Sequence, residues 1–175
     1  MSIRAAINRI FLLLYYDSIR RLAREGKVFS ASKRFIGVSP DSSCEIVIVN
    51  DSNNDVQMQL LLIEVPTQAK TFLDIYHNST IVSLGSEVDI VCKRLGYATS
   101  KMKAYSGGSY TPGEKAYEGV IPAGGGGPGG KYFMGGQSEV GLAFIVDPGH
   151  NIHIVVTNKD TATHDFSVRV EWAEE

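Results

Sequence analysis

The sequence predicts a mainly β protein, a jelly-roll-like antiparallel β-sandwich preceded by one amphipathic α-helix at the N-terminus. Three observations predict this fold class: an alternation of apolar and polar residues over the last thirty-odd residues, an apolar stripe at helical spacing near the start, and short β-branched runs between them. Short strands separated by turns at intervals of ~8–12 residues are typical of sandwiches and jelly rolls. The chain has 175 residues, which suits one domain with a core of its own.

The C-terminal segment has the clearest pattern. A proline-glycine turn at 147–150 precedes two strands that are joined at 157–160. Since side chains alternate along a strand, each strand should have one apolar and one polar face. The apolar face of the first strand holds Ile152, Ile154 and Val156; that of the second holds His164, Phe166, Val168, Val170 and Trp172, with Asp165, Ser167, Arg169 and Glu171 opposite.

The N-terminal segment has helical spacing from residue 2 to about residue 24. Ser2 can cap the start and Gly26 can end the helix. The apolar stripe consists of Ile3, Ile7, Ile10, Phe11, Leu14 and Leu22. We therefore expect a basic amphipathic helix over residues 1–26 and the sandwich over residues 27–175.

Charge divides at the same boundary. Residues 1–27 hold six basic and two acidic side chains, a net charge of +4, whereas the rest holds eleven basic and seventeen acidic, a net charge of −6. This asymmetry indicates a partner at the N-terminal end and argues against a body that wraps nucleic acid. Two interpretations of the helix stay open, packing on its own sandwich and docking on a partner, and a membrane-surface or nucleic-acid role is a minor third.

The region between helix and C-terminal segment should hold most of the strands. Turn-forming residues cluster at 39–43 and 51–55. The expected strands are residues 27–37, 45–50, 56–65, 72–77, 80–84 and 87–95.

Glycine dominates the middle of the chain. Twelve of the eighteen glycines lie between Gly107 and Gly136, and a run this unrestrained cannot hold a packed core. We expect a long excursion from the sandwich at 106–137. No Lys-Ser or Lys-Thr follows it and no helix begins there, which argues against a phosphate-binding loop. Its aromatic residues Tyr105, Tyr110, Tyr117, Tyr132 and Phe133 offer contact area for a partner.

No motif for catalysis, a cofactor or a metal stands out. His150 and His153 are three apart, a spacing that puts them on opposite faces of a strand. Cys44 and Cys92 lie far apart, so neither a zinc site nor a disulfide framework is indicated. No apolar run reaches the ~18–20 residues of a membrane span, and no signal peptide is evident. The chain is expected to be no enzyme and to carry no cofactor and no metal.

The region from 68 to 175 resembles a known family in the order and spacing of its motifs. The motifs are residues 72–76 (Phe-Leu-Asp-Ile-Tyr), 84–90 (Leu-Gly-Ser-Glu-Val-Asp-Ile), 93–95 (Lys-Arg-Leu), the glycine-rich stretch, 144–149 (Phe-Ile-Val-Asp-Pro-Gly), 155–158 (Val-Val-Thr-Asn) and 168–172 (Val-Arg-Val-Glu-Trp). This arrangement is similar to jelly-roll structural proteins of tailed-phage virions. Residues 1–67 carry no such similarity.

The resemblance implies a non-enzymatic virion structural protein on the capsid surface, a decoration or cement protein that binds the major capsid protein or other virion proteins. It also favours a homo-oligomer, with a trimer as the first candidate. The residues expected to bind partners are Ile3, Ile7, Phe11, Leu14, Arg20, Arg21, Tyr110, Tyr117, Tyr132 and Phe133. Alternatives are a minor capsid protein, a tail- or fibre-associated virion protein, a carbohydrate- or receptor-binding module and a small cupin-like enzyme. The sequence His150-Asn151-Ile152-His153 departs from the cupin metal motif.

Overall fold

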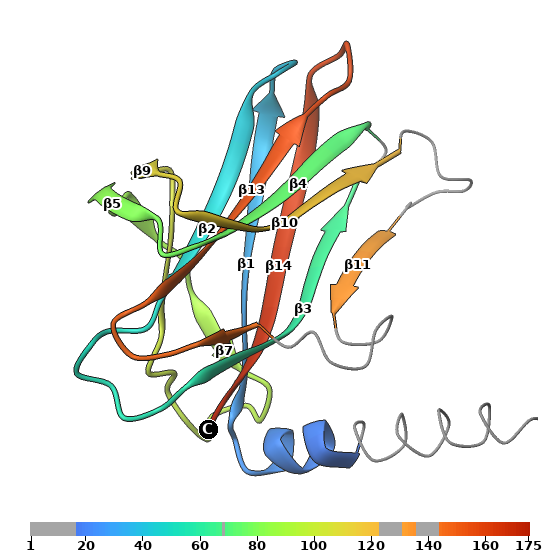
Figure 1. Ribbon diagram of the computed structural model, residues 1–175. Coiled ribbons are helices and arrows are strands. Elements are labelled where there is room, and N and C mark those ends of the chain that lie inside the picture. Colours follow the sequence, from blue (N-terminus) through green and yellow to red (C-terminus); the bar gives the residue numbers. More distant parts are fainter. Residues whose placement is uncertain (1–16, 68, 123–130, 136–143) are drawn as a thin grey trace, which may run out of the picture.

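The computed structural model describes residues 17–67, 69–122 and 144–175, and the backbone of residues 131–135. Two six-stranded antiparallel sheets face each other (Figure 1). The strands are β1 (Val28–Val38), β2 (Ser43–Val49), β3 (Met58–Pro66), β4 (Thr71–His77), β5 (Thr80–Ser83), β6 (Ser86–Glu87), β7 (Ile90–Cys92), β8 (Lys103–Ser106), β9 (Ser109–Thr111), β10 (Glu114–Ile121), β11 (Lys131–Gly135), β12 (Ile145–Val146), β13 (Asn151–Asn158) and β14 (His164–Glu174). The predicted class, mainly β with a short N-terminal helix, is confirmed.

The strand order follows a nested pattern. Sheet A has the order β11-β3-β14-β1-β7, with β12 also beside β3, and sheet B has the order β10-β4-β13-β2-β8-β6. The first four strands each pair antiparallel with a later strand taken in reverse order: β1 with β14, β2 with β13, β3 with β11 and β4 with β10. Successive members alternate between the two sheets, as in a long hairpin rolled into a sandwich, which agrees with a jelly-roll-like arrangement.

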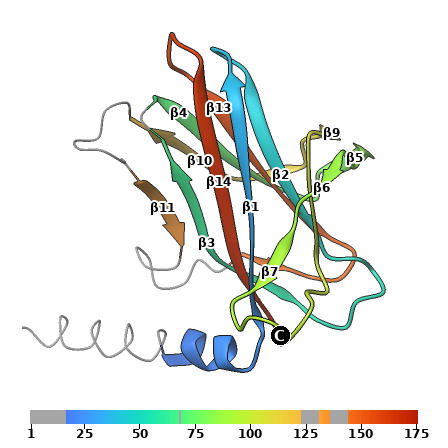
Figure 2. The same ribbon diagram turned by 180° about the vertical axis from the view of Figure 1, so that it is seen from behind.

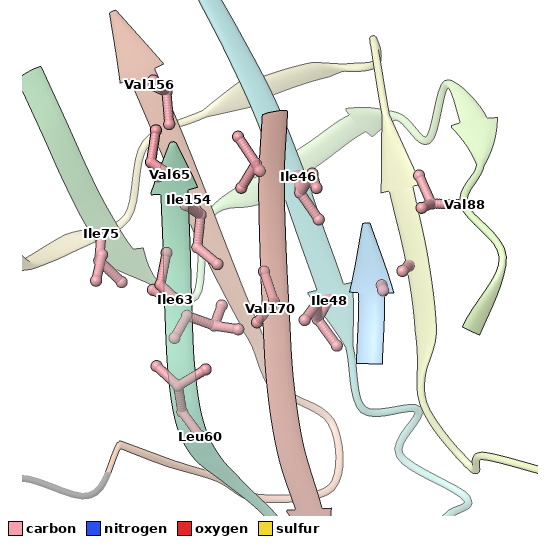
Figure 3. Packing of buried hydrophobic residues seen from close by; sticks show 14 of the residues in the cluster. Ile46, Ile48, Leu60, Ile63, Val65, Ile75, Val88, Ile154, Val156 and Val170 are labelled. Atoms are coloured by element: carbon pink, nitrogen blue, oxygen red, sulfur yellow. The ribbon is translucent and has the colours of Figure 1, made fainter. Parts of the chain in front are cut away.

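The core lies between the sheets and is built by the predicted alternation. Ile152, Ile154 and Val156 on β13 are fully buried, as are Val168, Val170 and Trp172 on β14. Figure 3 shows Ile154 and Val156 from sheet B among Ile63, Val65 and Val170 from sheet A. Burying a side chain of this size stabilises the fold by about 1.5–3 kcal/mol, so the interleaved faces hold the two sheets together.

Residues 78–113, between β4 and β10, form an insertion that reaches both sheets. β7 adds to β1 at one edge of sheet A, and β8 adds to β2 in sheet B. β5 and β9 form a separate two-stranded sheet, here called the ribbon, which stands beside the sandwich in both views (Figures 1 and 2). The insertion thereby covers the edges that β1 and β2 would otherwise leave unpaired.

Two predicted segments were wrong in detail. The strand expected at 87–95 is broken at Val88 and Asp89, because β6 pairs in sheet B whereas β7 pairs in sheet A. The segment expected to leave the sandwich at 106–137 instead contributes β10 to sheet B and β11 to sheet A, and β10 pairs along the whole of β4; only β9 lies outside the two sheets, in the ribbon. Its central glycines, 123–130, lie outside the described residues.

Residues 17–24 are helical and pack on the outer face of sheet A. Leu22 is 5% exposed and forms a small apolar cluster with Val28, Leu61 and Ala173, one from each of the three central strands. Ile19 and Ala23 pack against the same cluster. This end of the helix therefore packs on its own sandwich; Ile3, Ile7, Phe11 and Leu14 lie outside the described residues, and the alternative of partner docking stays open for them.

Candidate functional site: the helix junction and a buried histidine cluster

The helix ends in a tight turn at Gly26. The N–H of Gly26 donates to the carbonyl of Ala23 at 3.1 Å, and the N–H of Lys27 donates to that of Leu22 at 2.9 Å. This pair of hydrogen bonds, with a positive φ of 74° at Gly26, is a Schellman motif. The prediction that Gly26 ends the helix is confirmed.

Residues 91–97 hold this helix end in place; together with residues 22–28 they are called the junction. The N–H of Lys93 donates to the carbonyl of Val28 at 2.8 Å, and the Sγ of Cys92 lies 3.5 Å from the carbonyl of Gly26. The guanidinium of Arg94 donates to the carbonyl of Arg24. A terminal helix carbonyl thus gains a cationic donor, which stabilises the helix end.

The junction also exposes apolar and cationic side chains. Val91, Leu95 and Tyr97 are 50%, 84% and 57% exposed. A groove of about 490 Å³ beside them is lined by Ala23, Arg24, Lys93 and Arg94. The helix leaves the sandwich at the end where the C-terminus lies (Figure 1). The end of the helix is thus held in place and surrounded by exposed apolar and basic side chains. Such a surface is suited to contact with another protein.

A second candidate site is the histidine cluster: Glu45, Tyr76, Ser79, Tyr110 and His153. His153 points away from the core face of β13, yet it is only 2% exposed. Its Nε2 lies 2.9 Å from Oε2 of Glu45, and its Nδ1 lies 3.0 Å from Oγ of Ser79. The ring of Tyr110 lies 4.9 Å from the imidazole, centre to centre. The ribbon, which carries Tyr110, therefore covers a histidine that the sequence places on the outer face.

The hydrogen bonds of the cluster form a continuous chain. If Nε2–H donates to Glu45, Nδ1 accepts the Ser79 hydroxyl, and Ser79 Oγ accepts the N–H of Gly113 at 3.2 Å. Tyr110 donates to the carbonyl of Leu84 at 2.7 Å, and burial, more than the nearby Glu45 carboxylate, raises the pKa of this tyrosine. The bonds link β2, β13 and the ends of the ribbon.

A hydroxyl, an imidazole and a carboxylate in sequence also form the arrangement that activates a serine nucleophile. Here Ser79 is only 3% exposed, so no substrate atom can approach its Oγ in this conformation. The hydroxyl also holds the Gly113 amide. In this conformation, the cluster fastens the ribbon to the sandwich.

The structure separates the predicted partner-binding residues. Arg20 and Arg21 are exposed on the helix, and Arg21 pairs with Glu25 at 3.2 Å. Tyr110 lies in the ribbon over His153, and Tyr117 on β10 packs against the main core. The side chains of Tyr132 and Phe133 lie outside what the structure describes.

Sequence reasoning missed both the junction segment and the histidine cluster. Lys93, Arg94 and Leu95 are a basic pair followed by an apolar residue at the end of a strand, a signal that could have marked the junction. Glu45, Ser79 and His153 lie on three separate segments and carry no local motif. Only the sheet pairing brings them together.

Among the described residues, no three His, Cys, Asp or Glu side chains gather as ligands for a metal ion. A search of the same part of the chain finds no helix long and apolar enough to cross a membrane. No protein-family model, curated protein or solved structure matches this chain.

Proposed function

We propose that this chain is a non-enzymatic structural component of a virus particle, a decoration or cement protein that binds and stabilises the head shell. The observation that carries the proposal is the junction: a helix held at a fixed exit by residues 91–97, beside exposed apolar and basic side chains. The resemblance of residues 68–175 to tailed-phage structural proteins supports the same role.

The physical requirements of a decoration protein fit the molecule. A rigid sandwich supplies a body that keeps its shape, and the basic N-terminal segment supplies an attachment distinct from the acidic body. If the whole segment is helical, as its sequence predicts, a helix of this length is only marginally stable in water without a surface for its apolar side. Many weak attachments on one shell give strong overall binding through avidity. The major capsid protein is the proposed partner, and a homo-oligomer, first of all a trimer, would multiply the contacts.

The carbohydrate-binding alternative receives less support. The only tryptophan, Trp172, is fully buried and lies against Phe29 with ring centres 6.4 Å apart. It cannot offer the exposed aromatic platform on which sugars stack. In the tail- or fibre-associated alternative, the junction and N-terminal segment would also contact a virion protein, but that protein would belong to the tail or a fibre.

Co-sedimentation with assembled head shells tests the proposal. Removing residues 1–16 leaves Leu22 in its cluster with Val28, Leu61 and Ala173, so the shortened chain should stay folded, as circular dichroism would show. We expect the full chain to sediment with shells and the shortened chain to lose most of this binding. Equal binding by both chains would show that the N-terminal segment is not the attachment, and no binding by either would refute the proposal.

A further inference from the structure

We infer that the groove of the junction binds an acidic segment of a partner protein, with Arg24 and Arg94 taking its carboxylates. The inference deepens the proposed function and rests on the junction being a partner contact. It starts from the lining of the groove: of the four lining residues that the structure describes, three are cations, Arg24, Lys93 and Arg94.

Two of the three charges have no carboxylate partner in the part of the chain that the structure describes. Lys93 lies 2.7 Å from the carboxylate of Glu171, so its charge is matched. Within the described residues, no carboxylate pairs with Arg24 or Arg94. The nearby Glu25 is already shared by Arg21 and Lys27. The groove therefore presents two uncompensated guanidinium groups.

The side chain of Arg94 is ordered by two contacts within the junction. Its guanidinium carbon lies 3.8 Å from the centre of the Tyr97 ring, and one of its nitrogens donates to the carbonyl of Arg24. A guanidinium carries five N–H donors in a fixed plane, so most of its donors remain for a carboxylate. Because the side chain is already ordered, binding loses less conformational entropy.

The surroundings favour a protein segment over a nucleic acid. Leu95 and Tyr97 are largely exposed beside the groove and offer apolar contact to a neighbouring side chain. The body of the chain carries a net charge of −6, which repels a long polyanion. A short acidic segment that also contains an apolar residue could contact both the arginines and the exposed Leu95 and Tyr97, without bringing a long polyanion close to the acidic body.

Fluorescence anisotropy tests the inference with the full chain and two short labelled peptides. One is rich in glutamate and leucine, and the other has lysine in place of each glutamate. We expect only the glutamate peptide to bind and its affinity to fall as NaCl is raised. Arg24→Ala should weaken binding about tenfold, since a charge-assisted hydrogen bond is lost. In the described structure the Arg24 side chain has no partner, so this variant should fold.

Arg34→Ala is the matched control, because Arg34 is exposed and pairs with Asp165 away from the junction. It should leave peptide binding unchanged. Failure of the glutamate peptide to bind, equal binding by Arg24→Ala, or tighter binding of a single-stranded oligonucleotide would overturn the inference. Shell binding that survives Arg24→Ala would contradict this role of the groove while leaving the proposed function intact.

Discussion

At the scale of single residues, Gly26 sets the direction in which the chain leaves the sandwich. Its φ of 74° lies in the left-handed region, which side chains with a Cβ disfavour. A Cβ at this position would also lie 2.0 Å from Cδ1 of Tyr97. Both the turn and the close approach of Tyr97 therefore require glycine.

Gly26→Ala should destabilise the protein by more than the ~1–2 kcal/mol of a left-handed alanine, because the Tyr97 ring must also move. Gly37→Ala is the matched control: its φ is 68°, yet no atom lies within 4 Å of the added Cβ. Urea denaturation followed by circular dichroism measures both variants. A free-energy loss no larger for Gly26→Ala than for Gly37→Ala would contradict the described packing of Tyr97 on the turn.

Cys44 provides a second test at this scale. Burial raises the pKa of its thiol from 9.0 to about 12. The fold therefore favours the neutral thiol, and this contribution is complete below pH 9 and is lost as the pH rises toward 12. In a Cys92→Ser background, we expect Cys44 to resist a thiol reagent at pH 8 in the native state and to react after unfolding. Rapid reaction of the native protein would disprove this burial.

At the scale of elements, plain alternation allowed both the position and the buried face of the two C-terminal strands to be predicted. Ile152, Ile154 and Val156 on β13 and the apolar face of β14 could be identified because each sheet has one dry face. β10 was missed because glycine conceals its pattern. A Cβ on Gly119 would meet the Tyr117 side chain 2.4 Å away, so this glycine leaves room for a ring on the strand, where composition alone suggests a loop.

The histidine cluster was missed for a different physical reason. His153 occupies an outer-face position, where a histidine is ordinarily exposed, but it is buried between Tyr76 of β4 and Tyr110 of the ribbon. Its partners Glu45 and Ser79 come from segments 108 and 74 residues away along the chain. No local pattern encodes such an arrangement; it follows from the pairing of β13 with β2 and β4.

If the histidine cluster holds the ribbon on the sandwich, removing the histidine should make opening of the ribbon more frequent. His153→Ala leaves the buried Ser79 hydroxyl and the Glu45 carboxylate without their partner, at a cost of about 1–3 kcal/mol. Amide hydrogen exchange at 80–83 and 109–111 should become about tenfold faster or more, while β14 exchanges nearly as before. Ser43→Ala, which removes the exposed 2.8 Å pair with Thr157, should leave the ribbon unchanged. Unchanged ribbon exchange in His153→Ala would mean that the cluster does not fasten it.

At the scale of the whole molecule, the nested pairing of strands builds one compact body from which the N-terminal segment is set apart. The two sheets close on one apolar core, and the insertion at 78–113 both extends the sheets and supplies residues 91–97. The sequence allowed the sandwich, the leading helix and its end at Gly26 to be predicted. The junction could not be predicted, because it joins two segments about seventy residues apart through Tyr97 and Arg94.

We propose that this molecule attaches to a virus shell through its junction and N-terminal segment. Electron microscopy of the chain co-expressed with the head shell protein of the same genome tests it most directly. We predict regular density on the outside of the shell, with the sandwich standing outward and the junction end against the shell subunits. Bare shells, or sandwiches attached by the opposite end with the junction facing solvent, would show that the junction is not the site of attachment.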